Sequence, residues 1–166
     1  MEENTFIDLF VFRQMKVKEI ETLLAISPKQ RKELEEQYHE EIVDMQHIRK
    51  KFTKARQEYF KDYKEFYYWY KSQKQECSYC GVTQDELYKI FPSTLPLNDA
   101  VKRSSGTLEI ERLNSVTNEY SKENIALACP LCNNAKSNLI DEKSWRDLFA
   151  KPMFNYYQSL LKEIKE

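Results

Sequence analysis

A chain of 166 residues with two glycines and five prolines can hold one ordinary domain, or a small domain with an appendage, and this composition excludes a loop-rich or disordered protein. The formal net charge of −1 excludes a strongly basic chain, although acidic residues predominate in residues 19–46 and basic residues in residues 49–74. The sequence begins without a basic stretch leading into an apolar core, and it contains no apolar run of membrane-spanning length. We therefore expect a cytoplasmic protein.

The N-terminal part of the chain has the apolar spacing of helices. Residues 4–25 predict a short amphipathic helix, folded back on a longer one. Ser27 followed by Pro28 is typical of an N-cap with proline at the first helical position. From there to about residue 72 apolar residues recur every three or four positions, with no glycine and no further proline. This pattern predicts one long helix, or two helices joined by a bend.

The apolar stripe of this segment allows two interpretations. It is either a packed seam, within one chain or between two copies as in a coiled-coil homodimer, or part of a nucleic-acid-binding surface. The second interpretation rests on the basic residues of the range 49–74 and on four neighbouring aromatic residues, Tyr67, Tyr68, Trp69 and Tyr70. We expect residues 1–74 to form a helical N-terminal extension that is a coiled coil or a nucleic-acid-contacting arm.

The middle of the chain is predicted to form a turn, a short helix and a loop. Gly81 follows the first pair of cysteines and allows the left-handed turn that such a knuckle needs. Thr83 and Glu86 have the spacing of a capping box, which predicts a short helix through Phe91. Residues 92–106 contain two prolines, two adjacent serines and a glycine, and therefore predict a loop.

The remaining elements alternate between strands and helices. Periodicity and composition predict a strand over residues 108–113, a polar loop over 114–124 and a second strand over 125–129. Three helices are predicted to follow, over residues 130–138, 144–149 and 153–165. The last of these is amphipathic and should close the fold.

The four cysteines form two pairs, Cys77-x-x-Cys80 and Cys129-x-x-Cys132. In a reducing compartment, two such tight pairs favour a metal over disulfides. Four thiolates complete a tetrahedral zinc shell and leave no open position for a substrate. We therefore expect these cysteines to bind a structural Zn²⁺.

The segments LEIERL (108–113) and YSKENIALACPLCNNAKS (120–137) resemble the motif of the HNH endonucleases, whose fold is the ββα-metal unit. The resemblance covers about residues 75–150. It implies an α+β, mostly helical protein: an HNH core stapled by a four-cysteine zinc site, preceded by the long-helix extension and followed by a C-terminal helix over 151–166 that packs on the core.

The resemblance also implies a catalytic site. Glu111 matches the acid that binds the catalytic metal, Mg²⁺ or Mn²⁺, for which a hard carboxylate oxygen is a suitable ligand. Asn124 matches the asparagine that braces the loop, and Asn133 matches the last motif residue, which can offer an oxygen to the metal. Lys136 is placed to contact a substrate phosphate or simply to end its helix.

Arg112 stands where the family usually has the histidine that activates water. Some family members resemble this chain in having arginine there. An arginine cannot deprotonate water, but it can bind the scissile phosphate. Water would then be activated by the metal or by another side chain, for which the candidates are Tyr120, Glu109, His39 and His47. Glu109 lies two residues from Glu111 on the expected strand, and so shares its face.

Three functions follow from these features. The first is a metal-dependent endonuclease that hydrolyses phosphodiester bonds in nucleic acid, with DNA as the expected substrate. The second is a nucleic-acid-binding or scaffold protein that kept the fold without the chemistry, as the missing histidine suggests. The third is a zinc-stapled interaction module whose long helix dimerises or binds a partner.

Overall fold

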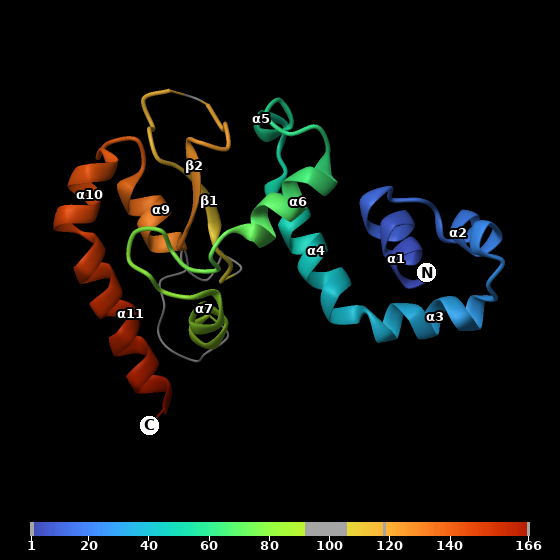
Figure 1. Cartoon of the computed structure of the whole chain (residues 1–166). Helices are drawn as coiled ribbons and strands as arrows, with labels where there is room; N and C mark the ends of the chain where they lie inside the picture. The colour runs from blue at the N-terminus through green and yellow to red at the C-terminus, as the bar shows by residue number, and fades with distance from the viewer. Residues whose placement is uncertain (1, 92–105, 118, 166) are drawn as a thin grey trace. The chain divides into compact units, whose positions relative to one another are not determined.

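The computed structural model describes the backbone of residues 2–91, 106–117 and 119–165, and the side chains of 5–91, 106–117 and 119–164 (Figure 1). The chain forms two compact units, a first unit of Met1–Tyr70 and a second unit of Lys71–Glu166. Helices predominate, and the described residues contain one sheet of two strands. This confirms the mostly helical α+β class. None of the described helices has the length and apolar character needed to cross a membrane.

The first unit opens with α1 (Glu2–Ile7), the π-helical turn η1 (Asp8–Phe12) and α2 (Val17–Leu24). The single helix expected over residues 4–25 is therefore wrong. The chain breaks at Gln14, which adopts a left-handed φ of 52°. The helix restarts at Lys16, whose main-chain N–H donates to the Glu19 carboxylate at 3.3 Å and so caps α2.

Four further helices follow: α3 (Pro28–Gln37), α4 (His39–Lys51), α5 (Lys54–Gln57) and α6 (Tyr63–Ser72). Ser27 caps α3 by accepting the Gln30 N–H at 3.3 Å, with proline in the first turn, as the sequence predicts. The prediction of one long helix over this segment is wrong. The helix breaks between α3 and α4, and beyond Lys51 the chain turns back so that the Tyr63 hydroxyl donates to the Met45 carbonyl of α4.

The apolar stripe is a packed seam within the first unit. Its buried residues include Ile42, Met45, Ile48 and Phe66. The Phe52 and Phe66 rings stack with centroids 5.2 Å apart. Because the described chain has no continuous helix from residue 28 to 72, the coiled-coil homodimer expected on such a helix has no structural basis here.

The expectation of a basic and aromatic surface over residues 49–74 is wrong in part. Tyr67 and Tyr70 lie in the core and Trp69 is half-buried, whereas Tyr68 is 58% exposed. The Arg49 guanidinium lies 3.9 Å above the centre of the Tyr63 ring, and it donates to the main-chain carbonyls at the end of η1. These aromatic residues and this arginine therefore mainly stabilise the first unit.

The second unit begins with the first cysteine knuckle and α7 (Gln84–Ile90). The predicted capping box is confirmed: the Glu86 N–H donates to Thr83 Oγ1 at 3.2 Å, and the Thr83 N–H donates to Glu86 Oε2 at 2.8 Å. The Gln84 side chain donates to the Gly106 carbonyl and accepts from the Leu108 N–H, both at 2.8 Å. Apart from Gly106, the loop predicted over 92–106 lies outside the described residues.

Two antiparallel strands and three helices complete the second unit. In β1 (Glu109–Arg112) and β2 (Ile125–Ala128), Glu111 pairs with Ala126. The helix α9 (Pro130–Lys136) packs on β1, which gives the order strand, strand, helix that the resemblance implies. The helices α10 (Glu142–Leu148) and α11 (Ala150–Lys165) follow, and α11 packs against α7, α9 and α10 (Figure 1).

We predict that Gly106→Ala destabilises the second unit more than Gly81→Ala. Both glycines have a left-handed φ, 65° at Gly106 and 78° at Gly81, so alanine should cost about 1–2 kcal/mol at either position. A Cβ at Gly106 would also lie 2.7 Å from the Phe91 Cβ, whereas a Cβ at Gly81 meets no atom within 4 Å. Denaturant unfolding measures both variants, and equal losses of stability would contradict this packing.

Candidate functional site

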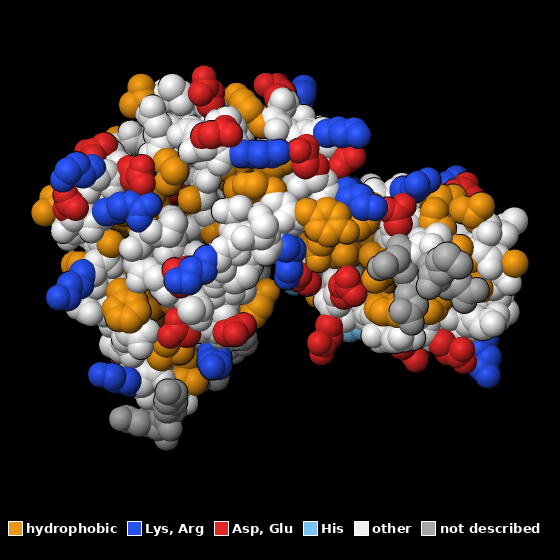
Figure 2. Space-filling view, viewed as in Figure 1, with side chains coloured by type: hydrophobic (Ala, Val, Ile, Leu, Met, Phe, Trp, Pro, Cys, Tyr) orange, Lys and Arg blue, Asp and Glu red, His pale blue; other side chains and the backbone are white. Residues whose placement is uncertain are grey.

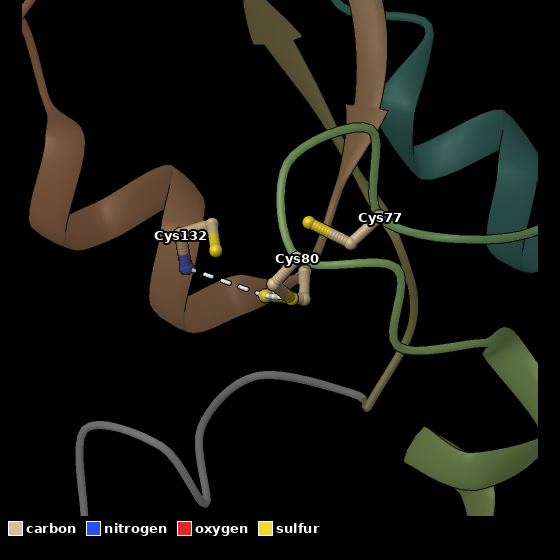
Figure 3. A group of neighbouring side chains, drawn as sticks. Cys77, Cys80 and Cys132 are labelled. Atoms are coloured by element: carbon tan, nitrogen blue, oxygen red, sulfur yellow. Dashed lines mark hydrogen bonds between the residues drawn. The ribbon is translucent and has the colours of Figure 1, made fainter. Parts of the chain in front are cut away.

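The four cysteine sulfurs gather at one buried point. Cys77 and Cys80 come from the first knuckle, and Cys129 and Cys132 from the junction of β2 and α9; Figure 3 shows the side chains of the knuckle and of α9 turned toward one another. All four sulfurs lie within 4.8 Å of one another, and those of Cys80 and Cys129 are 3.7 Å apart. A tetrahedral shell with Zn–S bonds of about 2.3 Å requires sulfurs about 3.8 Å apart. The cluster therefore fits a zinc ion.

Main-chain hydrogen bonds fix this cluster. The Ser78 N–H donates to the Leu127 carbonyl at 2.8 Å, which joins the first knuckle to β2. The Gly81 N–H donates to the Cys77 carbonyl at 2.9 Å and closes the knuckle. Cys129 is the N-cap of α9, and its sulfur accepts the Cys132 N–H at 3.3 Å. Each knuckle is therefore held in place by an element of the fold.

Glu111 is buried on β1 and forms an ion pair with Lys136 at the end of α9. The Lys136 ammonium lies 2.7 Å from Glu111 Oε1, and the side chains are 0% and 6% exposed respectively. The ammonium also donates to Ser115 Oγ at 2.7 Å and to the carbonyls of Arg112 and Ser137 at 3.2 and 3.4 Å. Lys136 thus joins α9, β1 and the loop that follows β1.

This placement corrects one expectation from the sequence. Lys136 is neither a surface residue that meets a substrate phosphate nor a simple helix end, because its ammonium is buried among oxygen acceptors. Burial raises the pKa of Glu111 above its ordinary value, and the hydrogen bond and charge of Lys136 oppose that rise. Lys136 is therefore the main group that favours the ionised form of Glu111.

Arg112, the last residue of β1, lies close to Tyr120 of the loop that follows the strand. The Arg112 guanidinium lies 5.2 Å from the centre of the Tyr120 ring and donates to the Thr117 carbonyl at 3.3 Å. Both side chains are half-buried. Arg112 therefore contacts the loop, whereas the carboxylate of Glu111, its neighbour in the chain, contacts α9.

Asn124 ties this loop together. Its Oδ1 accepts the Asn114 N–H at 2.8 Å, and its Nδ2 donates to the carbonyls of Glu119 and Asn114 at 2.8 and 3.2 Å. Its main-chain carbonyl accepts the Leu113 N–H at 2.8 Å. One side chain therefore fixes both ends of the loop between the strands.

Asn133 and Lys136 are three residues apart on α9, so their side chains are neighbours on the helix surface. The main-chain N–H of Asn133 donates to the Cys129 carbonyl at 2.9 Å. Within the described residues, neither the side-chain amide of Asn133 nor Glu111 Oε2 makes a hydrogen bond. A carboxylate and an amide oxygen are ligands that suit Mg²⁺, which takes few protein ligands and keeps several waters. Each residue therefore offers an oxygen of the type that such a cation binds.

The remaining base candidates are distributed over both units. Glu109 is half-buried on β1, on the same strand face as Glu111. His39 and His47 lie on α4, in the first unit. The two histidines therefore belong to a different unit from Glu111.

Ser115 and Tyr79 belong to the surroundings of Glu111, and the sequence did not indicate them. Ser115 accepts from Lys136, as described above. Tyr79 lies inside the first knuckle, its buried hydroxyl has no hydrogen-bond partner among the described residues, and burial, followed by the charge of Glu111, raises its pKa. The position of Tyr79 between two cysteines was the available signal, whereas Ser115 had none, because its contact with Lys136 depends on tertiary packing.

Neither family models nor curated proteins match this sequence. Comparison with solved structures returned the rare-cutting HNH restriction endonuclease PacI, described as perturbing DNA by an extraordinary mechanism. That protein belongs to the family that the sequence motif indicated. The match is 27% identical with a TM-score of 0.45, and it covers 58% of this chain and 64% of that chain, which is less than two thirds of its length.

We predict that Lys136→Met destabilises the second unit by about 3–5 kcal/mol, because it leaves the Glu111 carboxylate buried without a cation. The loss should be larger at pH 8 than at pH 5. A buried carboxyl with a raised pKa is protonated and neutral at low pH, and it destabilises the fold as the pH rises through that pKa.

Denaturant unfolding at both pH values measures this loss. Lys143→Met, on the exposed surface of α10, is the matched control and should change stability by less than about 0.5 kcal/mol. The double variant Glu111→Gln, Lys136→Met should recover most of the loss. A double variant as unstable as Lys136→Met would show that the ion pair does not cause it.

Proposed function

We propose that the second unit is a divalent-metal-dependent HNH-type endonuclease that hydrolyses phosphodiester bonds in nucleic acid, with DNA as the expected substrate. One observation carries this proposal. Glu111 and Arg112 lie on the first strand of a strand–strand–helix unit, and this unit lies beside a four-cysteine cluster. The motif of residues 108–137 supports it independently of the fold.

Each residue has a distinct role in this proposal. Glu111 and Asn133 would hold Mg²⁺ or Mn²⁺, which when bound stabilises charge on the phosphate and lowers the pKa of water. Arg112 would bind the scissile phosphate through charged hydrogen bonds that strengthen as negative charge develops. Asn124 keeps the loop of Arg112 in one conformation.

Tyr120 is the best-placed candidate to accept a proton from water. Its ring lies beside the guanidinium that we assign to the phosphate, whereas the alternatives are Glu109 on the strand and the histidines of the first unit. The four cysteines would bind zinc in a purely structural role, because four thiolates fill its coordination shell.

Binding of nucleic acid would use local rather than global charge. The net charge of the chain is −1, and on the face of the second unit that Figure 2 shows, basic side chains are interspersed with acidic ones around α10 and α11. Arg112 is the cation that we propose for phosphate contacts within the second unit. Exposed lysines of the range 49–74 are a separate proposal for contacts with nucleic acid. We place this activity in the cytoplasm.

A second candidate function is nucleic-acid binding without hydrolysis. It is favoured by the state of Glu111, which is buried and already paired with Lys136, and by the different directions of Glu111 toward α9 and of Arg112 toward the loop. A catalytic site would require both groups to act on one phosphate.

We predict that the full chain cleaves plasmid DNA, single-stranded DNA or RNA in the presence of Mg²⁺ or Mn²⁺, and that Glu111→Gln abolishes this cleavage. Glutamine keeps the size of the side chain and an acceptor for Lys136, but it removes the counter-charge of a buried ammonium. Circular dichroism therefore has to show that Glu111→Gln is folded before its activity is compared. Arg112→Gln should reduce the rate by about 10²–10³-fold. Glu123→Gln, an exposed loop residue, is the control and should keep full activity.

The same assay separates the alternatives. Absence of cleavage with binding retained would contradict the enzyme proposal and favour the second candidate. Absence of both cleavage and binding would leave only a zinc-stapled interaction module. Cleavage that Glu111→Gln retains would contradict the assignment of the metal ligand.

We predict that the purified protein contains about one zinc ion per chain and that Cys129→Ser unfolds the second unit, because binding energy at such a site is folding energy. Metal analysis and hydrogen exchange measure this. Amides of α9 and β2 should lose protection, whereas those of α4 in the first unit should keep it. Full zinc content or unchanged protection in Cys129→Ser would contradict the proposal.

A further inference from the structure

The side chain of Arg146, on α10, contacts the first cysteine knuckle. Its Nη1 donates a hydrogen bond to the main-chain carbonyl of Ser78, a residue 68 positions earlier in the chain. Its guanidinium carbon lies 4.9 Å from the centre of the Tyr79 ring. These are the two residues that separate the cysteines of the knuckle. One side chain of α10 therefore contacts the whole segment between the first two cysteines.

Arg146 is itself held in place by its own helix. Its Nε and Nη2 atoms both lie 2.9 Å from Oε1 of Glu142, one helical turn earlier. The neighbouring residue, Trp145, anchors this helix: its side chain is 1% exposed, and its ring stacks on that of Phe149 with centroids 5.0 Å apart. The guanidinium is therefore fixed between an anchored helix and the knuckle.

The contact with Arg146 completes a set of hydrogen bonds around the first ligand pair. The Ser78 N–H donates to the Leu127 carbonyl of β2, and the Cys77 N–H donates to the Val82 carbonyl, both at 2.8 Å. The Ser78 carbonyl, on the other side of the same residue, accepts from Arg146. A hydrogen bond from a charged donor is stronger than one between neutral groups. Of these three bonds, the one from Arg146 is made by a side chain, so a substitution can remove it.

A metal ion in the cluster would give this contact a second effect. Four thiolates around a divalent ion carry more negative than positive charge, and buried charge is costly unless other groups compensate it. Arg146 is permanently charged, and it donates to the residue next to Cys77. Groups that orient metal ligands from outside the coordination shell change metal affinity by about 10–100-fold.

We propose that Arg146 is a positioning residue of the four-cysteine site, which fixes the knuckle in its ligand-binding conformation and thereby slows loss of the metal. This inference rests on the proposal that the cluster binds zinc, and it does not depend on whether the second unit cleaves nucleic acid. Helix α10, which contributes none of the four cysteines, then controls how long the metal stays bound.

The test compares Arg146→Met with Lys143→Met in the full chain loaded with Co²⁺, whose bonds to sulfur give a charge-transfer absorption. Methionine keeps an unbranched apolar side chain and removes the charge and the donors. Lys143 is the matched control, because it lies on the same helix, is 86% exposed and pairs with Asp147 four residues later. After addition of excess EDTA, Arg146→Met should lose cobalt about 10-fold faster than the wild type, or more, and Lys143→Met at the wild-type rate.

Two further variants separate positioning from a general loss of stability. Arg146→Lys keeps a charge and a donor, so it should lose cobalt at a rate between those of the wild type and Arg146→Met. Gly106→Ala strains the same unit through Phe91 instead of the knuckle, and it should leave the rate of cobalt loss unchanged. If Gly106→Ala accelerated the loss as much as Arg146→Met, metal release would follow unfolding of the unit, and the positioning role would be overturned.

Failure of the inference and failure of the metal site give different results. Equal rates of cobalt loss in the wild type and Arg146→Met, with a four-thiolate spectrum in both, would overturn the role of Arg146 and leave the metal site intact. Absence of that spectrum in the wild type would overturn the metal site and the inference together.

A measurement on the wild type alone covers the case in which Arg146→Met does not fold. In nuclear magnetic resonance spectra of the zinc-loaded protein, an Nη proton of Arg146 should exchange slowly and its nitrogen should show scalar coupling to the carbonyl carbon of Ser78 through the hydrogen bond. A guanidinium that rotates freely in the zinc-loaded protein would overturn the inference.

Discussion

The convergence of four cysteine sulfurs is the constraint on which the second unit depends. Its sheet has two strands of four residues each, which is too little to be stable alone. The cluster joins the first knuckle to the junction of β2 and α9, and a link between distant segments removes much of the conformational freedom of the unfolded chain. The first knuckle is hydrogen-bonded to β2, and α9 begins at its N-cap, Cys129. The remaining helices therefore have a fixed surface on which to pack.

The chemistry that we propose lies next to this cluster but uses different atoms. The cysteines leave no position for a substrate, whereas β1 presents a carboxylate and a guanidinium. Lys136 and Asn124 hold these two groups through different elements, α9 for Glu111 and the loop for Arg112. The same ion pair that orients Glu111 also compensates its charge. At the metal site that we propose, affinity for a divalent cation would therefore depend on how Glu111 divides its two oxygens between the ammonium and the metal.

Local signals in the sequence predicted much of the fold. The caps at Ser27 and Thr83, the two strands and the cysteine pairs depend on neighbouring residues, and the structure has them where the sequence placed them. The long helix failed because a spacing of three or four residues fits one helix as well as two that fold back on each other. The contact of Tyr63 with Met45 that favours the second arrangement is not local.

The residues of the candidate site could likewise be predicted only in part from the sequence. The resemblance of the motif selected Glu111, Arg112, Asn124 and Asn133, because their spacing along the chain is characteristic. It could not predict that Lys136 is buried against Glu111, since that contact depends on how α9 packs on β1.

One crystallographic measurement tests the central claim, that a structural metal and a catalytic metal occupy two separate sites in the second unit. Crystals of the zinc-loaded full chain would be soaked in Mn²⁺, and anomalous difference maps recorded at the absorption edges of both metals. We predict a zinc peak surrounded by the four cysteine sulfurs and a separate manganese peak bound by oxygens of Glu111 and Asn133. A manganese peak that avoids Glu111, or a cysteine cluster without zinc, would contradict the account.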